Sequence, residues 1–123
     1  MKQTHLSIRL DLTSDDRIGP GKIALLEAIS ETGSISGGAR KIGMSYRRAW
    51  LLVEQINLSL IKPAIEAAPG GRKGGGATLT PVGRQLIDLY RSIEDAAHQA
   101  AKEQFKAMEK LVRKGKRPAA PEA

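Results

Sequence analysis

The N-terminal part of the chain changes from a two-residue to a helical hydrophobic period. Four aliphatic side chains alternate with polar ones: Leu6, Ile8, Leu10 and Leu12. A period of two predicts a half-buried strand. From Lys22 to Ile29 the apolar residues recur at helical spacing, and Gly33 is suited to cap the end of that helix. Residues 13–21 between the two patterns are rich in turn formers and predict a loop.

Two further helical segments are joined by a glycine. The first begins at Ser34, and the second extends from about Ser45 to Leu60. Gly43 supplies a turn in which a positive φ is unstrained because there is no Cβ, and the small Ala39 lets two helices approach closely. The second segment has a core stripe: Ala49, Leu52, Val53, Ile56 and Leu60. This arrangement predicts a helix-turn-helix.

A glycine-rich segment lies between two short segments of strand character. Residues 64–67 and 77–80 are the predicted strands, and residues 69–76 hold Arg72 and Lys73 among five glycines. This order predicts a β-hairpin wing with a basic tip. A nucleotide-phosphate loop is the alternative, but it requires Ser or Thr after its lysine, and here Lys73 is followed by glycine. We therefore favour the wing.

A long helix is predicted for residues 81–112, with Thr80 as its N-cap and Pro81 at its first position. Its apolar positions step by four and three: Val82, Leu86, Leu89, Ile93, Ala96 and Ala100. At about 1.5 Å per residue the helix spans roughly 48 Å, more than so small a domain can cover. We therefore predict a dimer seam at four positions: Leu86, Leu89, Ile93 and Ala96.

The elements together predict a mostly α fold: a winged helix-turn-helix with a small β-hairpin wing and a long C-terminal dimerisation helix. The winged helix-turn-helix occupies residues 1–80, and the dimerisation helix occupies residues 81–112. Residues 113–123 contain several basic residues, prolines and alanines, and we expect a disordered basic tail there.

The composition of the chain limits which classes of molecule it can bind. A formal net charge of +7 and a pI of about 10.0 indicate an anionic partner, either nucleic acid or an anionic surface. The chain has no Cys, and His5 and His98 lie in different elements, so we expect neither a metal site nor a cofactor. No apolar run approaches the ~20 residues of a membrane span. We expect a cytoplasmic, nucleoid-associated protein with no membrane contact.

The segment 34–50 carries four cations and no acid, which suits binding to DNA. Ser45 is placed to cap the second helix, whose first turn then presents Tyr46, Arg47 and Arg48. In a helix-turn-helix this end of the recognition helix meets base edges in the major groove. Arg47 is the predicted base reader, because an arginine fork fits guanine O6 and N7. Arg48 is the predicted phosphate contact.

Further candidate contacts have open alternatives. Ser34 and Ser36 stand at a helix N-terminus, where they either bind phosphate or serve only as capping residues. Trp50 lies one turn beyond Tyr46, beside the core stripe, and either packs or contacts a thymine methyl or sugar. In the wing, Arg72 and Lys73 are predicted to contact the DNA backbone or minor groove.

Several segments resemble the N-terminal DNA-binding domain of ModE-type molybdate-responsive regulators: residues 19–29, 31–36, 43–50 and 70–76. The stretch Gly-Met-Ser-Tyr-Arg-Arg-Ala-Trp, combined with the glycine wing, makes the likeness specific, and it covers about residues 5–100. The resemblance implies a homodimer, built through the long helix, that binds a two-fold operator near genes for molybdate uptake or molybdenum enzymes.

Full-length members of that family carry C-terminal oxyanion-binding domains, whereas about 20 residues follow the matched region here. We therefore expect no molybdate site in this chain, which is then a stand-alone regulator with another trigger or a truncation. The leading hypothesis is a homodimeric, sequence-specific DNA-binding transcription regulator of molybdenum-related genes, with double-stranded DNA as its partner. The alternative is an architectural protein that binds nucleic acid largely without sequence preference. No residue constellation indicates an enzyme.

Overall fold

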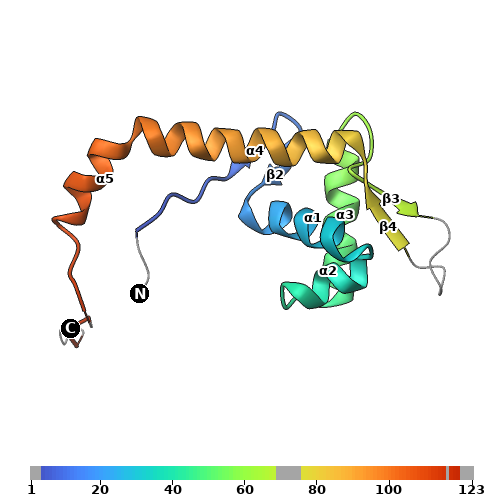
Figure 1. The fold of residues 1–123 in the computed structure, drawn as a ribbon, viewed down its shortest axis with the longest axis horizontal. Helices are drawn as coiled ribbons and strands as arrows, with labels where there is room; N and C mark the ends of the chain where they lie inside the picture. The colour runs from blue at the N-terminus through green and yellow to red at the C-terminus, as the bar shows by residue number, and fades with distance from the viewer. Residues whose placement is uncertain (1–3, 69–75, 116, 120–123) are drawn as a thin grey trace.

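The fold is taken from a computed structural model, which describes residues 4–68, 76–115 and 117–119 (Figure 1). The elements follow in chain order: β1 (Leu10–Asp11), β2 (Arg17–Ile18), α1 (Pro20–Thr32), α2 (Ile35–Lys41), α3 (Tyr46–Ser59), β3 (Ile65–Ala68), β4 (Gly76–Leu79), α4 (Pro81–Ala100) and α5 (Lys102–Glu109). Helices α1 to α3 with the antiparallel β3–β4 hairpin form a winged helix-turn-helix, and α4 crosses above them (Figure 1). The predicted fold class is confirmed.

Helix α1 is the centre of the core, because it packs against α2, α3, α4 and β4. Five of its side chains are buried: Ile23, Leu25, Leu26, Ala28 and Ile29. The two helices α1 and α2 approach closely at Gly38, where an added Cβ would lie 2.6 Å from Ile29 Cγ1. Ala39 beside it is also buried. The sequence indicated a small residue at this contact, and Gly38 permits the closer approach.

The predicted helix ends are confirmed by hydrogen bonds. The Ser34 side chain accepts from the Gly37 N–H at 2.9 Å, and the Ser45 side chain accepts from the Arg48 N–H at 3.2 Å. Thr80 Oγ1 accepts from the Gly83 N–H at 3.1 Å and donates to the Pro63 carbonyl at 2.6 Å. The turn between α2 and α3 has Gly43 at φ +70°, as the glycine required.

The N-terminal strand is shorter than predicted. Its alternation is correct from Ile8 onward, since Ile8, Leu10 and Leu12 are half-buried and the polar residues between them are exposed, but Leu6 is exposed. However, only Leu10–Asp11 pairs, and its partner β2 lies in the segment that was expected to be loop. The partner strand ends because Pro20 lacks an N–H and starts α1, so residues before Leu10 have no strand to pair with.

The single helix predicted for residues 81–112 is wrong: α4 ends at Ala100 and α5 occupies Lys102–Glu109. Between them, Ala101 has φ −99° and ψ 10°, and the chain bends there (Figure 1). A seven-residue separation in a straight helix rises about 10.5 Å, yet the ring centroids of His98 and Phe105 are 5.2 Å apart. The bend thus accompanies ring contact across it, and no Gly or Pro in the sequence signals it.

Candidate nucleic-acid interface

The start of α3 is held rigidly by α2 and the turn. The Met44 N–H donates to the Ala39 carbonyl at 2.9 Å, and the Ser45 cap fixes the first turn of α3. On the inner side of α3, Ala49, Val53 and Ile56 are buried in the core. The outer side of the same helix is therefore fixed in direction, and it holds the candidate contact residues.

The first turn of α3 projects its side chains into solvent. Tyr46 is 58% exposed, and Arg47 and Arg48 are exposed as well. Neither guanidinium has an ion-pair partner in the described part of the chain. By contrast, the exposed Lys41 of α2 forms an ion pair with Glu31 of α1. Both arginines are thus available to an external anion or base.

Trp50 lies at the surface and not in the core. Its side chain is 46% exposed, whereas the neighbouring Ala49 is fully buried. Together with Tyr46, it lines an open groove of about 620 Å³ between α3 and the β3–β4 hairpin. Core packing is therefore excluded for Trp50, and its contact with DNA stays a prediction.

The groove between α3 and the hairpin is acidic. Among its described lining residues, Glu54 and Glu66 are the charged ones, and no Lys or Arg is present. Carboxylates repel phosphate, but they accept hydrogen bonds from base amino groups such as cytosine N4. Inside this groove the charges therefore suit donor groups on base edges better than the DNA backbone.

Asn57 joins the recognition helix to the wing. Its Oδ1 accepts from the Ala64 N–H at 2.8 Å and the Ile65 N–H at 3.2 Å, and its Nδ2 donates to the Ile65 carbonyl at 3.2 Å. The side chain therefore fixes the first residue of β3 against α3. The role of Asn57 was not predicted from the sequence, because a lone Asn on a helix gives no signal of backbone partners seven and eight residues away.

The remaining candidate contacts are placed as follows. Ser34 acts as an N-cap, and its Oγ lies 3.4 Å from the Oγ of the exposed Ser36. Capping is thereby established for Ser34, and phosphate contact by either serine stays a prediction. Arg72 and Lys73 lie outside the described residues.

Two apolar stripes lie side by side on α4. Gly83, Ile87 and Tyr90 are buried against the body of the protein. The predicted dimer seam lies next to them: Leu86 is half-buried against the core, Leu89 is 55% exposed, Ile93 is 42% exposed, and Ala96 is exposed. The seam is therefore available to a partner, and the core stripe beside it was missed by the sequence analysis.

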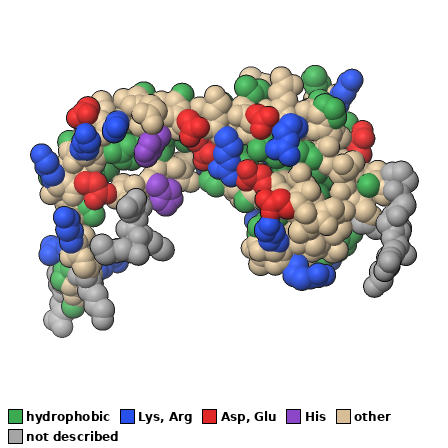
Figure 2. Space-filling view, in the orientation of Figure 1, with side chains coloured by type: hydrophobic (Ala, Val, Ile, Leu, Met, Phe, Trp, Pro, Cys, Tyr) green, Lys and Arg blue, Asp and Glu red, His purple; other side chains and the backbone are tan. Residues whose placement is uncertain are grey.

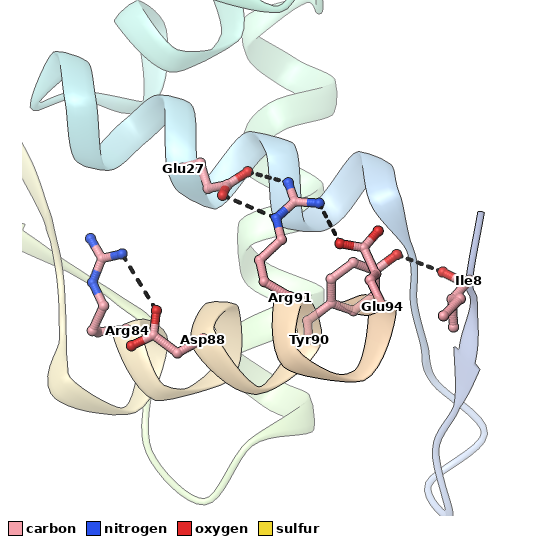
Figure 3. A network of polar contacts seen from close by, with 7 residues as sticks. All are labelled: Ile8, Glu27, Arg84, Asp88, Tyr90, Arg91 and Glu94. Carbon is pink, nitrogen blue, oxygen red and sulfur yellow. Dashed lines mark hydrogen bonds and ion pairs between the residues drawn. The ribbon is translucent and has the colours of Figure 1, made fainter. Parts of the chain in front are cut away.

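A polar network attaches α4 to the rest of the molecule (Figure 3). The Arg91 guanidinium donates to both carboxylate oxygens of Glu27 on α1, at 2.5 and 3.3 Å, and to Glu94 at 2.7 Å. These bonds, to Glu27 first and to Glu94, raise the pKa of Arg91 above its usual range, so it stays charged.

On the other side of this network, the Tyr90 hydroxyl donates to the Ile8 carbonyl at 2.6 Å (Figure 3). Burial raises the pKa of Tyr90, and the neighbouring Glu94 carboxylate adds to that shift. Through these bonds α4 is held to both α1 and the N-terminal segment.

The described residues contain no group of three or more His, Cys, Asp and Glu side chains that could hold a metal ion. No helix in this part of the chain is long and apolar enough to cross a membrane.

Fold and surface define a winged helix-turn-helix protein with an exposed, cation-bearing recognition helix. No family model matches the chain. It is 53% identical over 78 residues to the molybdenum-pterin-binding protein MopB of Rhodobacter capsulatus, covering 63% of this chain and 29% of MopB. It is 42% identical over 88 residues to the transcriptional regulator ModE of Yersinia pestis, covering 72% of this chain and 34% of that regulator.

The DNA-binding transcriptional dual regulator ModE of Escherichia coli K12 is 40% identical over 88 residues, again 72% of this chain and 34% of the relative. This chain therefore carries a ModE-type N-terminal region, and the resemblance drawn from its sequence is confirmed. The chain spans about a third of the length of the curated relatives it matches. These relatives are named as regulators and binding proteins, and not as enzymes.

Proposed function

We propose that this protein is a homodimeric, sequence-specific DNA-binding transcription regulator of molybdenum-related genes, acting in the cytoplasm at the nucleoid. The observation that carries the proposal is the capped first turn of α3, which presents Tyr46, Arg47 and Arg48 to solvent, with neither arginine in an ion pair to another described residue. Relatives named as DNA-binding and transcriptional regulators support it. The link to molybdenum rests on the names of the relatives alone.

In this proposal each candidate residue makes a different kind of contact with DNA. Arg47 reads a base edge in the major groove, and Arg48 contacts phosphate. Ser34 and Ser36 add phosphate contacts at the start of α2, and Trp50 offers its exposed ring to a base methyl or sugar. Arg72 and Lys73 contact the backbone or minor groove beyond the half-site.

A dimer would supply the second recognition helix, which binds the second half-site of the DNA. Exposed Leu89 and Ile93 lie on one side of α4, next to half-buried Leu86. Two copies joined along this seam would present two recognition helices, which must engage half-sites about one helical turn of DNA apart or a multiple of it. Operator binding and dimerisation are therefore coupled.

The decisive experiment compares Arg47→Ala with the unchanged protein on an operator selected from random duplexes. We expect a loss of about 1–3 kcal/mol on the operator and relaxed preference at one base position in each half-site. Arg17→Ala, which removes an exposed arginine of β2, is the matched control and should leave operator affinity unchanged.

The double variant Arg72→Ala with Lys73→Ala tests the proposed contact of the wing with the DNA backbone or minor groove. It should weaken all duplexes evenly and flatten the dependence of affinity on salt, because phosphate contacts release counterions whatever the sequence. Selection that yields no common sequence would instead favour the architectural alternative. Equal weakening of operator and scrambled duplex by Arg47→Ala would remove that residue from base reading.

A further inference from the structure

A dense group of positively charged residues follows the winged helix-turn-helix and α4 in the sequence. Residues 101–119 hold seven of the 20 Lys and Arg residues and two of the 13 Asp and Glu residues. Their net charge is +5, compared with +7 for the whole chain. Figure 2 shows basic side chains gathered over α5 with acidic ones among them, whereas acidic and basic side chains are intermixed over the middle of the molecule.

The lysines of α5 are arranged along one side. Lys102, Lys106 and Lys110 follow one another at four-residue spacing, so each lies about one turn, or 6 Å of rise, beyond the last. Arg113 and Lys114 follow in the chain past the end of the helix, and all five side chains are exposed. Among the described residues, the charge of Lys106 is partly neutralised by an ion pair with Glu103, whose carboxylate oxygen lies 3.6 Å from the Lys106 nitrogen; both side chains are exposed to solvent.

The helix is held away from the body. None of its residues is buried, and it packs against α4. Its half-buried residue is Phe105, whose ring meets His98 of α4 across the bend at Ala101. The bend turns α5 to the side of α4 on which α1, α2 and α3 lie (Figure 1). A straight continuation of α4 would have carried these lysines away from that side.

We propose that α5, with Arg113 and Lys114, is a second DNA-binding surface that contacts the phosphate backbone without reading sequence. The inference rests on the proposed function, because it places the duplex on the recognition-helix side of the molecule. The row of lysines follows the DNA beside the half-site and increases the affinity for every sequence. Specificity stays with α3.

An anionic membrane surface is the competing partner for a basic helix. The structure favours DNA for two reasons. The apolar side of α5 is short: the Phe105 ring contacts His98, and the exposed apolar residues are Met108 on the helix and Leu111 and Val112 just after it. Helices that bind at a membrane surface gain their binding from a wide apolar face, which α5 lacks. In addition, Glu103 and Glu109 of α5 would be repelled by an anionic membrane.

The test is a variant with Lys102→Gln, Lys106→Gln, Lys110→Gln and Lys114→Gln in the full chain. Gln is a good helix former and none of these positions is buried, so the fold should be unchanged by circular dichroism and thermal melting. Binding is measured on a random-sequence duplex and on the selected operator at several salt concentrations. Each lost phosphate contact flattens the log–log salt slope by about 0.9, so we expect a slope flatter by roughly 2 to 4 for each bound protomer.

A matched control removes the same charge elsewhere: Arg9→Gln, Arg17→Gln, Lys22→Gln and Lys62→Gln. Its slope should stay close to that of the unchanged protein, because counterion release depends on charges at the contact and not on net charge. Equal slopes for the α5 variant and the unchanged protein would overturn the inference. So would lysine-dependent flotation with phosphatidylserine vesicles combined with an unchanged DNA slope.

The outcome for α5 is separable from that for the proposed function. If the unchanged protein prefers its operator over random DNA and the α5 variant has the same slope, this inference alone fails. If the unchanged protein binds all duplexes equally, the sequence-specific function fails, and the slope difference still decides the role of α5. The ratio of operator to random affinity should be the same in both proteins.

Discussion

Two neighbouring stripes of the same helix, α4, have opposite surroundings. Gly83 is buried against Ala64 and Leu79, and Ile87 and Tyr90 are buried in the core. By contrast, Leu89 and Ile93 on the adjoining side of the helix are exposed. Both stripes are apolar, so hydrophobicity alone does not distinguish them. Helix α4 therefore has two apolar stripes with different roles. The buried stripe packs within the chain, and we call it the filled stripe; the exposed stripe would be covered by the proposed partner copy.

The polar groups of α4 mark which stripe is internal. The Tyr90 hydroxyl donates a hydrogen bond to the Ile8 carbonyl, and the Arg91 guanidinium donates to the Glu27 carboxylate. The filled stripe is therefore bordered by hydrogen bonds to other elements. No such bond involves the Leu89 or Ile93 side chains, which have no polar atoms. The direction of α4 relative to α3 is therefore set by the filled stripe, before any dimer forms.

The largest expected difference between the stripes is in stability. Tyr90→Ala should lower the free energy of unfolding by about 3–5 kcal/mol, because it empties a large buried site. Leu89→Ala, at the next residue, should change the stability of the isolated protomer by less than about 0.5 kcal/mol. Urea denaturation at low protein concentration checks both. Similar losses for the two variants would show that the stripes are not distinct.

The next largest effect is on assembly. Leu89→Asp with Ile93→Asp should weaken dimerisation at least about 100-fold, since charges would be buried in an apolar seam without partners. Sedimentation at micromolar concentration measures it, and operator affinity should fall in parallel because two half-sites must be engaged. The control is Asp88→Asn with Asp95→Asn on the same helix. An unchanged protein that sediments as a monomer near 13.2 kDa would remove the seam from the proposal.

The two stripes also show what the sequence could predict. The steps of four and three through Leu86, Leu89 and Ile93 were visible, and they identified the exposed stripe. The filled stripe was missed because its members are dissimilar: a glycine, an aliphatic residue and a tyrosine do not form a uniform apolar pattern. Only the fold shows that the three belong together, because Ile87 and Tyr90 join the core and Gly83 lies against Ala64 and Leu79.

Local signals were predicted better than long-range ones. The caps at Ser34, Ser45 and Thr80 depend on bonds to residues three positions away, so the sequence contains both partners. Strand β2 escaped prediction because its two residues carry no period. The bonds of Asn57 likewise depend on the path of the chain between α3 and β3. For the candidate site, exposure of Tyr46, Arg47 and Arg48 agrees with the prediction, and their contact with DNA is untested.

A smaller effect tests the bond at the edge of the filled stripe. Tyr90→Phe keeps the ring and removes the donor to Ile8, which should cost about 0.5–1.5 kcal/mol at pH 7. The pKa of Tyr90 is raised in the folded protein, so the unfolded chain releases this proton first, near pH 10.0. The unfolding free energy should therefore fall as pH rises above about 10, and Tyr90→Phe should lack this part of the fall.

Urea titrations from pH 7 to 11 measure the pH effect, with Tyr46→Phe as the control at an exposed tyrosine. The difference between the unchanged protein and Tyr90→Phe should shrink at alkaline pH. A difference that grows with pH would mean that the hydroxyl is ionised more easily in the fold than in the unfolded chain, contrary to its burial.

The smallest expected effect concerns the ion pair that borders the two stripes. The Arg91 guanidinium donates twice to Glu27, but the two side chains are 43% and 33% exposed, so water screens their attraction. A double-mutant cycle with Glu27→Gln and Arg91→Gln should give a coupling of about 0.2–1 kcal/mol. Because Arg91 also bonds Glu94 in both Glu27 backgrounds, the cycle isolates the pair between α1 and α4. The coupling should decrease between about 0.05 and 1 M salt, since the Debye length falls to roughly 3 Å. A zero coupling at low salt would show that buried Tyr90 and Ile87 alone fix α4, and that the ion pair merely follows their packing.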